Sequence, residues 1–302
     1  MSILTDYRRT IRRAYERIST GSEIAATRCG AIEYAVAGAG PPVLSVHGAG
    51  GGFDQGLELA APLARRGVRV IAVSRFGYLR TPLPSDASAA AQADAYACLL
   101  DFLSIERAAI FGASAGAPSS MQFALRYPDR TAALVLLVPA AYAPRPHGEE
   151  SVRTPRGTPW LFDTALRSDF LFWALRELAH DTFIRAILGT PPEVVASAAG
   201  SERARIERIM DLILPVRPRR LGLVNDAAVV STLPHYELEK ISAPTLAISA
   251  VDDLYGTFDG ARYTAEHVPH GRFVGYPSGG HMLVGHNDEA SLQIGEFLNH
   301  HA

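Results

Sequence analysis

The chain has 302 residues, enough for one large domain or two modest ones with a buried core. Hydrophobic residues make up 48% of it and charged residues 20%, which excludes a globally disordered protein. The formal net charge of −2 argues against binding to nucleic acid or to an acidic membrane, because both usually need a basic excess.

The first predicted element is an amphipathic helix within residues 1–20. Apolar residues recur at helical spacing from Leu4 to Ile18, with arginines on the outer face. We interpret it as a helix docked on the body of the protein, with a membrane-surface or targeting helix as the alternative. It has no apolar core of a secretory signal, and the longest apolar run, 132–141, is too short for a bilayer. A soluble cytoplasmic protein without a membrane partner is expected.

The two cysteines, Cys29 and Cys98, are 69 positions apart and stand outside any metal-ligand spacing. Two residues cannot form a disulfide framework for a chain of this length. We interpret them as small, reduced core residues, as expected in the cytoplasm.

From residue 30 onward, short β-branched strands alternate with helical segments. This alternation predicts an α/β fold, with a mostly parallel sheet and helices on both faces. The predicted strands run 32–36, 43–47, 68–73, 108–112, 133–138, 245–249 and 272–276. We assign residues 21–140 and 234–302 to this core.

Between residues 141 and 233 no further strands are predicted. The segment holds both tryptophans, Trp160 and Trp173, and its apolar residues favour helices. A helical insertion between two strands of an α/β sheet predicts a cap over the carboxyl edge, where ligands bind. The alternative is a second structural subdomain whose aromatic residues pack against one another in a small core of their own.

The sharpest motif is the G-x-S-x-G pentapeptide from Gly112 to Gly116. It stands where an apolar strand gives way to a helix, which is the setting of a nucleophile elbow. The strained turn needs small flanking residues and exposes the hydroxyl of Ser114 at the edge of the sheet. The alternative is a tight turn in which Ser114 only caps the helix.

A nucleophilic serine needs a base, and the base needs an orienting acid. In this architecture the order along the chain is serine, acid, histidine. His281 follows the last predicted strand after small residues, so we predict that it is the base. The weaker candidates are His267, His270, His286, His300 and His301.

Two aspartates follow the strand 245–249 at the same predicted edge. We predict that Asp253 is the acid and that Asp252 serves the turn. Asp226, late in the helical insertion, is a third candidate because the acid can lie on another loop.

A glycine-rich run, His47 to Gly52, directly follows the strand residues 43–46. Acyl transfer develops a negatively charged oxygen, and the hydrogen-bond donors must already point at it. We expect the N–H groups of Ala115 and Ala49 to form this oxyanion hole, with Gly50 as the alternate donor. The run lacks the spacing of either common phosphate-binding motif, and His47 is expected to brace the loop.

No metal or cofactor is expected. H-E-x-x-H is absent, and the pair His267 and His270 is interrupted by a proline without a nearby acidic ligand.

The chain resembles the α/β-hydrolase fold family. The resemblance rests on five pieces: residues 47–52, 74–78, 112–116, Asp253 and 280–281. It implies an eight-stranded, mostly parallel sheet, a helical cap after the sixth strand, and a covalent acyl-enzyme in most hydrolytic members. Ser74 stands where many relatives have aspartate. Ser114, where epoxide hydrolases and haloalkane dehalogenases use aspartate, argues against both activities, and the elbow does not match prolyl aminopeptidases.

The residues favour a serine hydrolase of a carboxylic ester with a small or medium apolar acyl group, cleaved through an acyl-enzyme. The same triad serves carbon–carbon bond and lactone hydrolases, so these remain open. A third hypothesis is a non-catalytic small-molecule receptor on the same scaffold. The sequence does not indicate the oligomeric state.

Overall fold

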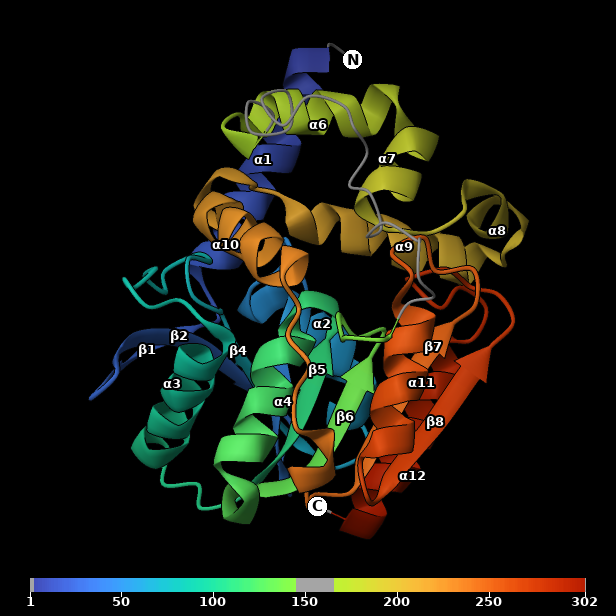
Figure 1. Cartoon of the computed structure of the whole chain (residues 1–302). Helices are drawn as coiled ribbons and strands as arrows, with labels where there is room; N and C mark the ends of the chain where they lie inside the picture. The colour runs from blue at the N-terminus through green and yellow to red at the C-terminus, as the bar shows by residue number, and fades with distance from the viewer. Residues whose placement is uncertain (1–2, 145–165, 302) are drawn as a thin grey trace.

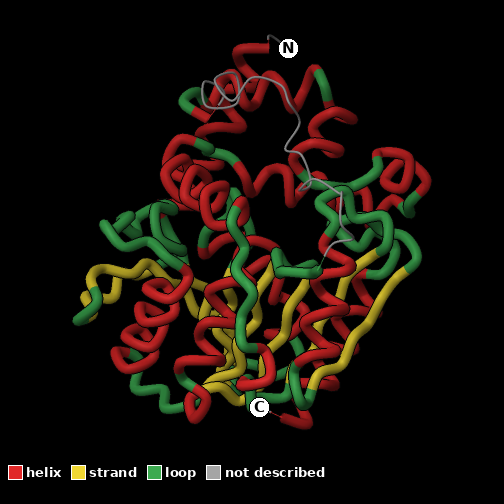
Figure 2. Tube along the Cα trace, in the orientation of Figure 1, coloured by secondary structure: helices red, strands yellow, loops and turns green. Residues whose placement is uncertain are grey.

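The structure is a computed structural model that describes residues 3–144 and 166–301. One sheet runs through the centre of the molecule, as Figure 2 shows. Its strands are β1 (Glu23–Thr27), β2 (Gly30–Ala37), β3 (Pro42–Val46), β4 (Arg69–Val73), β5 (Ala108–Ala113), β6 (Thr131–Leu137), β7 (Thr245–Ala250) and β8 (Gly271–Tyr276).

The strands lie in the order β1-β2-β4-β3-β5-β6-β7-β8. β2 pairs antiparallel with both β1 and β4, and the remaining neighbours are parallel. The predicted mostly parallel eight-stranded sheet is therefore confirmed. β1 was not among the predicted strands, because it is a short edge strand whose side chains are mostly exposed.

Helices cover both faces of the sheet (Figure 1). Successive residues of β5 point to opposite faces: Ile110 packs in one cluster with α3 (Ala89–Phe102), α4 (Ala117–Arg126) and α11 (Thr257–His267). Phe111 packs in the other with α2 (Phe53–Ala64) and α12 (Asn287–His301). Both faces of the inner strands β5, β6 and β7 are buried, which explains why these strands are apolar without alternation.

A helical insertion, described from residue 166 to 231, separates β6 from β7 and lies over the carboxyl edge of the sheet (Figure 1). Trp173 packs there against an apolar cluster of its own, so this aromatic residue builds a second core. Trp160 lies outside the described residues, and the predicted division at 141–233 stays a prediction. The helices are α6 (Asp169–Leu178), α7 (His180–Ile187), α8 (Pro192–Ser197), α9 (Gly200–Ile213) and α10 (Arg220–Ser231).

The N-terminal helix α1 (Ile3–Ser19) lies beside the helical insertion (Figure 1). Tyr7 packs edge-on against Phe170 of α6, with ring centroids 5.0 Å apart. Arg17 donates to the carbonyl oxygens of Asp211 and Leu214 and forms an ion pair with Asp54 of α2. Helix α1 thus joins the insertion to the core. No helix within 3–144 and 166–301 combines the length and apolar character needed to cross a membrane.

Asp54 lies between two arginines in the interior. Its carboxylate binds Arg219 at 2.7 Å and Arg17 at 3.0 Å. Burial raises the pKa of Asp54, but the two guanidinium groups lower it by more, so the net shift is downward from 3.8. A lowered folded-state pKa stabilises the protein above the unfolded-state pKa, and this stabilisation is lost as the pH falls through the folded-state value.

We therefore expect Asp54→Asn to lower the free energy of unfolding by about 3–5 kcal/mol at pH 7, because it leaves buried guanidinium charge unpaired. The difference from the wild type should shrink in acid, below the ordinary carboxyl pKa. Urea denaturation of both proteins at pH 7 and pH 3 measures this difference in the free energy of unfolding. Asp259→Asn, which breaks an exposed pair with Arg262, is the control and should cost less than about 1 kcal/mol. A difference that widens in acid would contradict the argument.

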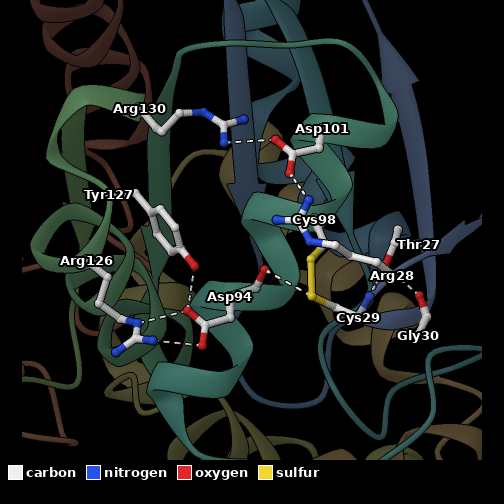
Figure 3. The surroundings of a disulfide bond; sticks show 10 residues. All are labelled: Thr27, Arg28, Cys29, Gly30, Asp94, Cys98, Asp101, Arg126, Tyr127 and Arg130. Atoms are coloured by element: carbon white, nitrogen blue, oxygen red, sulfur yellow. Dashed lines mark hydrogen bonds and ion pairs between the residues drawn. A yellow bond between two sulfur atoms is a disulfide. The ribbon is translucent and has the colours of Figure 1, made fainter.

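The cysteine prediction is wrong: Cys29 and Cys98 form a disulfide bond (Figure 3). The turn between β1 and β2 carries Cys29 over α3, where the two Cα atoms are 6.0 Å apart, within the normal range for a disulfide. Cys98 is buried, as predicted, but Cys29 is exposed. The pairing depends on a strand that the sequence pattern did not reveal. Reduced thiols no longer support a cytoplasmic location.

Replacing both cysteines with serine should lower the free energy of unfolding by about 4 kcal/mol, since the bond closes a long loop in the unfolded chain. Chemical denaturation with and without reductant checks this value. A thiol titration of the denatured wild-type protein should find no free thiol, and finding two would contradict the bond.

Candidate active site

The predicted nucleophile elbow connects β5 to α4 through a single 3-10 turn, Ser114–Gly116. Ser114 has a backbone φ of +49°, in the left-handed region that non-glycine residues rarely adopt. A Cβ on Gly116 would lie 2.6 Å from the carbonyl oxygen of His47, and one on Gly112 would collide with Ser120. Both flanking positions therefore need glycine, and the turn leaves Ser114 partly exposed at the edge of the sheet.

The three predicted triad residues meet at this edge. Ser114 Oγ lies 2.9 Å from His281 Nε2, although 167 positions separate the two residues. His281 Nδ1 lies 2.7 Å from Asp253 Oδ2. Ser114 follows β5, Asp253 follows β7 and His281 follows β8, so three parallel strands deliver their side chains to one place.

The side chain of Asp253 is completely buried, and its carboxylate accepts several hydrogen bonds. Besides His281, its carboxylate accepts bonds from the hydroxyl of Thr257 and, at 2.8 Å, from the N–H of Tyr255. Burial raises the pKa of Asp253, and the charge of His281 together with these hydrogen bonds lowers it by more. The net pKa is lowered, so the group is an ionised acceptor, and His281 Nδ1 carries the proton that it donates to Asp253.

The other two acid candidates have different partners. Asp252 accepts hydrogen bonds from the N–H groups of Gly279 (3.1 Å) and Gly280 (2.7 Å), and thereby shapes the loop before His281. Asp226 is buried and forms an ion pair with Arg75. Neither contacts the imidazole of His281 in the described structure.

The rival histidines lie elsewhere. His267 stacks on Tyr263 and bonds the carbonyl oxygen of that residue. His286 stacks on Tyr276. Across 3–144 and 166–301, no group of three or more His, Cys, Asp and Glu side chains is placed to hold a metal ion.

The helical insertion braces the loop of His281, a feature that sequence reasoning missed. The carbonyl oxygen of Gly189 accepts the N–H groups of both His281 (3.2 Å) and Leu254 (2.9 Å). Thr190 Oγ1 accepts the N–H of Met282 at 3.1 Å. The ring of Tyr255 stands edge-on to the imidazole, with centroids 4.8 Å apart. The Gly-Thr pair after α7 carries no recognisable signal in the sequence.

The glycine-rich run curls beside the serine, and most of its backbone groups are engaged. Gly48 N–H donates to Gln55 Oε1 at 3.1 Å, and Gly50 N–H donates to the hydroxyl of Tyr78 at 3.2 Å. Among the described residues, the N–H of Ala49 has no hydrogen-bond partner. Gly50, the alternate oxyanion donor, is thus already used, whereas Ala49 is available.

His47 anchors this loop. It is fully buried, and burial together with the charge of Arg75 lowers its pKa well below 6.5, so the ring is neutral. Its Nε2 accepts the N–H of Arg75 at 3.0 Å, which places the proton on Nδ1. Nδ1 then donates to the carbonyl oxygen of Gly48 at 2.6 Å.

Ser114 lies on a strained strand-to-helix turn and is hydrogen-bonded to His281, which in turn bonds the buried Asp253. A family model for the α/β hydrolase fold matches residues 41–288, and the chain belongs to this family.

Individual relatives match in part. The chain is 38% identical over 107 residues to the uncharacterized hydrolase YcgS of Bacillus subtilis, a match that covers 35% of this chain and 37% of that protein. It is 31% identical over 125 residues to 2-hydroxy-6-oxo-6-phenylhexa-2,4-dienoate hydrolase of Comamonas testosteroni, covering 38% and 44%. The matches thus span less than half of these curated relatives.

A solved structure matches over nearly the whole length. The α/β hydrolase fold protein from Nakamurella multipartita aligns with a TM-score of 0.71 and 29% identity. The alignment covers 92% of this chain and 98% of that one.

Proposed function

We propose that this protein is a serine hydrolase that cleaves a carboxylic ester through an acyl-enzyme. The observation that carries the proposal is the continuous hydrogen-bonded series from Ser114 through His281 to Asp253. A hydroxyl is a weak nucleophile, and this series supplies both the base that removes its proton and the acid that fixes the base.

In the first half of the reaction, Ser114 Oγ attacks the ester carbonyl carbon and its proton passes to His281 Nε2. The carbonyl oxygen becomes an oxyanion, which the N–H groups of Ala49 and Ala115 stabilise. His281 then returns the proton to the departing alkoxide, and the alcohol leaves. In the second half, water attacks the acyl-enzyme while His281 accepts its proton, and the carboxylic acid departs.

The surroundings of the glycine-rich run favour an apolar substrate. A Cβ on Gly50 would lie 3.5 Å from Ile213 and 3.8 Å from Leu223, two apolar residues of the helical insertion. These side chains remove water from beside the oxyanion loop, which strengthens the hydrogen bonds made there.

Hydrolysis of a carbon–carbon bond is the second candidate. The partial similarity to the dienoate hydrolase of Comamonas testosteroni favours it, because the compound in that relative's name contains no ester or amide bond, and its hydrolysis must therefore break a carbon–carbon bond. The same nucleophile and base serve both reactions, and the shape of the pocket selects the bond.

The test compares the purified full-length protein on p-nitrophenyl butyrate, a simple lactone and a vinylogous diketone, alongside labelling with a fluorophosphonate and peptide mass spectrometry. Ester turnover with label on Ser114 supports the proposal. Turnover of the diketone alone replaces it with the second candidate. Label on Ser114 without any turnover, as a receptor would give, or no label at all, overturns it.

A further inference from the structure

Arg75 lies directly behind the glycine-rich run and reaches three separate parts of the molecule. It follows β4, and its side chain is only 7% exposed. Its Nη2 donates to the carbonyl oxygen of Gly48 at 3.2 Å, and its Nη1 donates to that of Ala115 at 3.3 Å. The same two nitrogens bind both carboxylate oxygens of Asp226, in α10, at 2.7 and 2.5 Å.

The contact with Gly48 bears on the oxyanion hole because of peptide geometry. The carbonyl of Gly48 and the N–H of Ala49 belong to one planar peptide, in which they point in opposite directions. Donors that hold the carbonyl oxygen in the interior therefore aim the N–H outward. Gly48 O receives three of them: His47 Nδ1 at 2.6 Å, Arg75 Nη2 at 3.2 Å and the N–H of Gly51 at 3.3 Å.

The second expected oxyanion peptide is held in the same manner. The carbonyl of Ser114 shares a peptide with the N–H of Ala115, and it accepts the N–H of Ala140 at 3.0 Å. Arg75 donates a hydrogen bond to the next carbonyl oxygen along the chain, that of Ala115. One guanidinium thus contacts the peptide that carries the Ala49 N–H and, across the expected oxyanion, the peptide that follows the Ala115 N–H.

Asp226 and Tyr78 fix the guanidinium in turn. Burial lowers the pKa of Arg75 and the charge of Asp226 raises it by more, so the group stays charged. Tyr78 donates its hydroxyl proton to Asp226 at 2.5 Å and accepts the N–H of Gly50 at 3.2 Å. This bond turns Gly50 away from the role of oxyanion donor and leaves Ala49 in that role.

We propose that Arg75, held by Asp226 from the helical insertion, is a positioning residue that aims the Ala49 N–H at the oxyanion of the reaction. The inference rests on the proposed function. A positioning role can be told apart from a purely structural ion pair between α10 and the core. A residue that aims a donor changes the affinity for the transition state more than the affinity for the substrate.

Two substitutions and one control separate these roles. Arg75→Met removes the guanidinium at similar length, and Arg75→Lys keeps the charge but lacks the fork that serves two carbonyls and a carboxylate together. The control is Arg219→Met. Arg219 is another buried arginine. It binds Asp54 with two nitrogens and donates to the carbonyl of Gly51, but it does not contact the peptide that carries the Ala49 N–H.

Each variant is assayed for kcat and KM on p-nitrophenyl butyrate, for thermal midpoint, and for the inhibition constant of an alkyl trifluoromethyl ketone. This ketone adds to a serine nucleophile and places an oxyanion where the ester would. We expect Arg75→Met to lower kcat about a hundredfold, near the loss of one oxyanion donor, with KM within about threefold. The inhibition constant should rise by the same factor as kcat falls.

Arg75→Lys should show the same pattern at about a tenfold effect, and it decides the matter if Arg75→Met does not fold. Arg219→Met should lower the thermal midpoint while keeping the ratio of inhibition constant to KM within threefold. The inference is overturned if a folded Arg75 variant changes only the thermal midpoint, or if the control changes that ratio equally. Failure of the proposed function is recognised separately, because the wild-type protein would then neither hydrolyse the ester nor carry label on Ser114.

Discussion

Replacing Ser114 with alanine should reduce kcat for an ester about a million-fold, the loss expected when the nucleophile of a working triad is removed. The fold should survive, because alanine fits the space and removes only the hydroxyl that bonds His281. Initial rates with active-site titration measure the effect. The residual activity of the variant is the rate enhancement that substrate binding and the oxyanion donors still provide.

Ser45→Ala is a matched control for this substitution. Ser45 is buried in the neighbouring strand β3 and bonds the carbonyl oxygen of Gly56 at 2.9 Å, without contact to His281. It should lower stability slightly and leave turnover within a few-fold. An alanine variant at position 114 that keeps wild-type turnover would place the nucleophile elsewhere and remove the basis of the mechanism.

Replacing Asp253 with asparagine should lower kcat about ten-thousand-fold, with the geometry nearly intact. An ionised carboxylate accepts the Nδ1 proton and leaves Nε2 free to take the proton of Ser114. An amide can present its NH₂ group instead, which stabilises the tautomer that cannot act as a base. The burial of Asp253 enlarges the effect, since water cannot replace the lost charge.

Asp252→Asn provides the comparison, because the neighbouring carboxylate also lies beside the histidine loop but bonds only backbone N–H groups there. Its effect on kcat should be about tenfold, the consequence of a less ordered loop. Single-turnover kinetics on both variants measures which substitution slows the chemical step more. A larger loss in Asp252→Asn than in Asp253→Asn would transfer the role of the acid to position 252.

The parts of the site that sequence reasoning anticipated are those encoded locally. The elbow around Ser114 is one, because a strained turn needs glycine two residues to either side of the serine. The glycine-rich run at 47–52 is another. His281 could be predicted because parallel strands end at one edge, so a side chain just past such a strand is a candidate neighbour of Ser114.

The parts that escaped prediction are pairings between distant segments. Arg75 and Asp226 are 151 positions apart, and Cys29 and Cys98 are 69 apart, with no spacing rule to connect them. Both pairs depend on how one element is laid over another. The prediction of Asp253 over Asp252 agrees with the hydrogen bond between Asp253 and His281, although the two candidates are adjacent in the chain.

The bonds from Gly189 and Thr190 to the loop of His281 also set a rule for protein engineering. Exchanging the helical segment between homologues is an obvious way to graft a new substrate preference onto this scaffold. In this molecule such a transplant also removes the hydrogen bonds that support the loop of His281. A chimera should therefore keep residues 189 and 190 with the recipient, and place its junctions on either side of them.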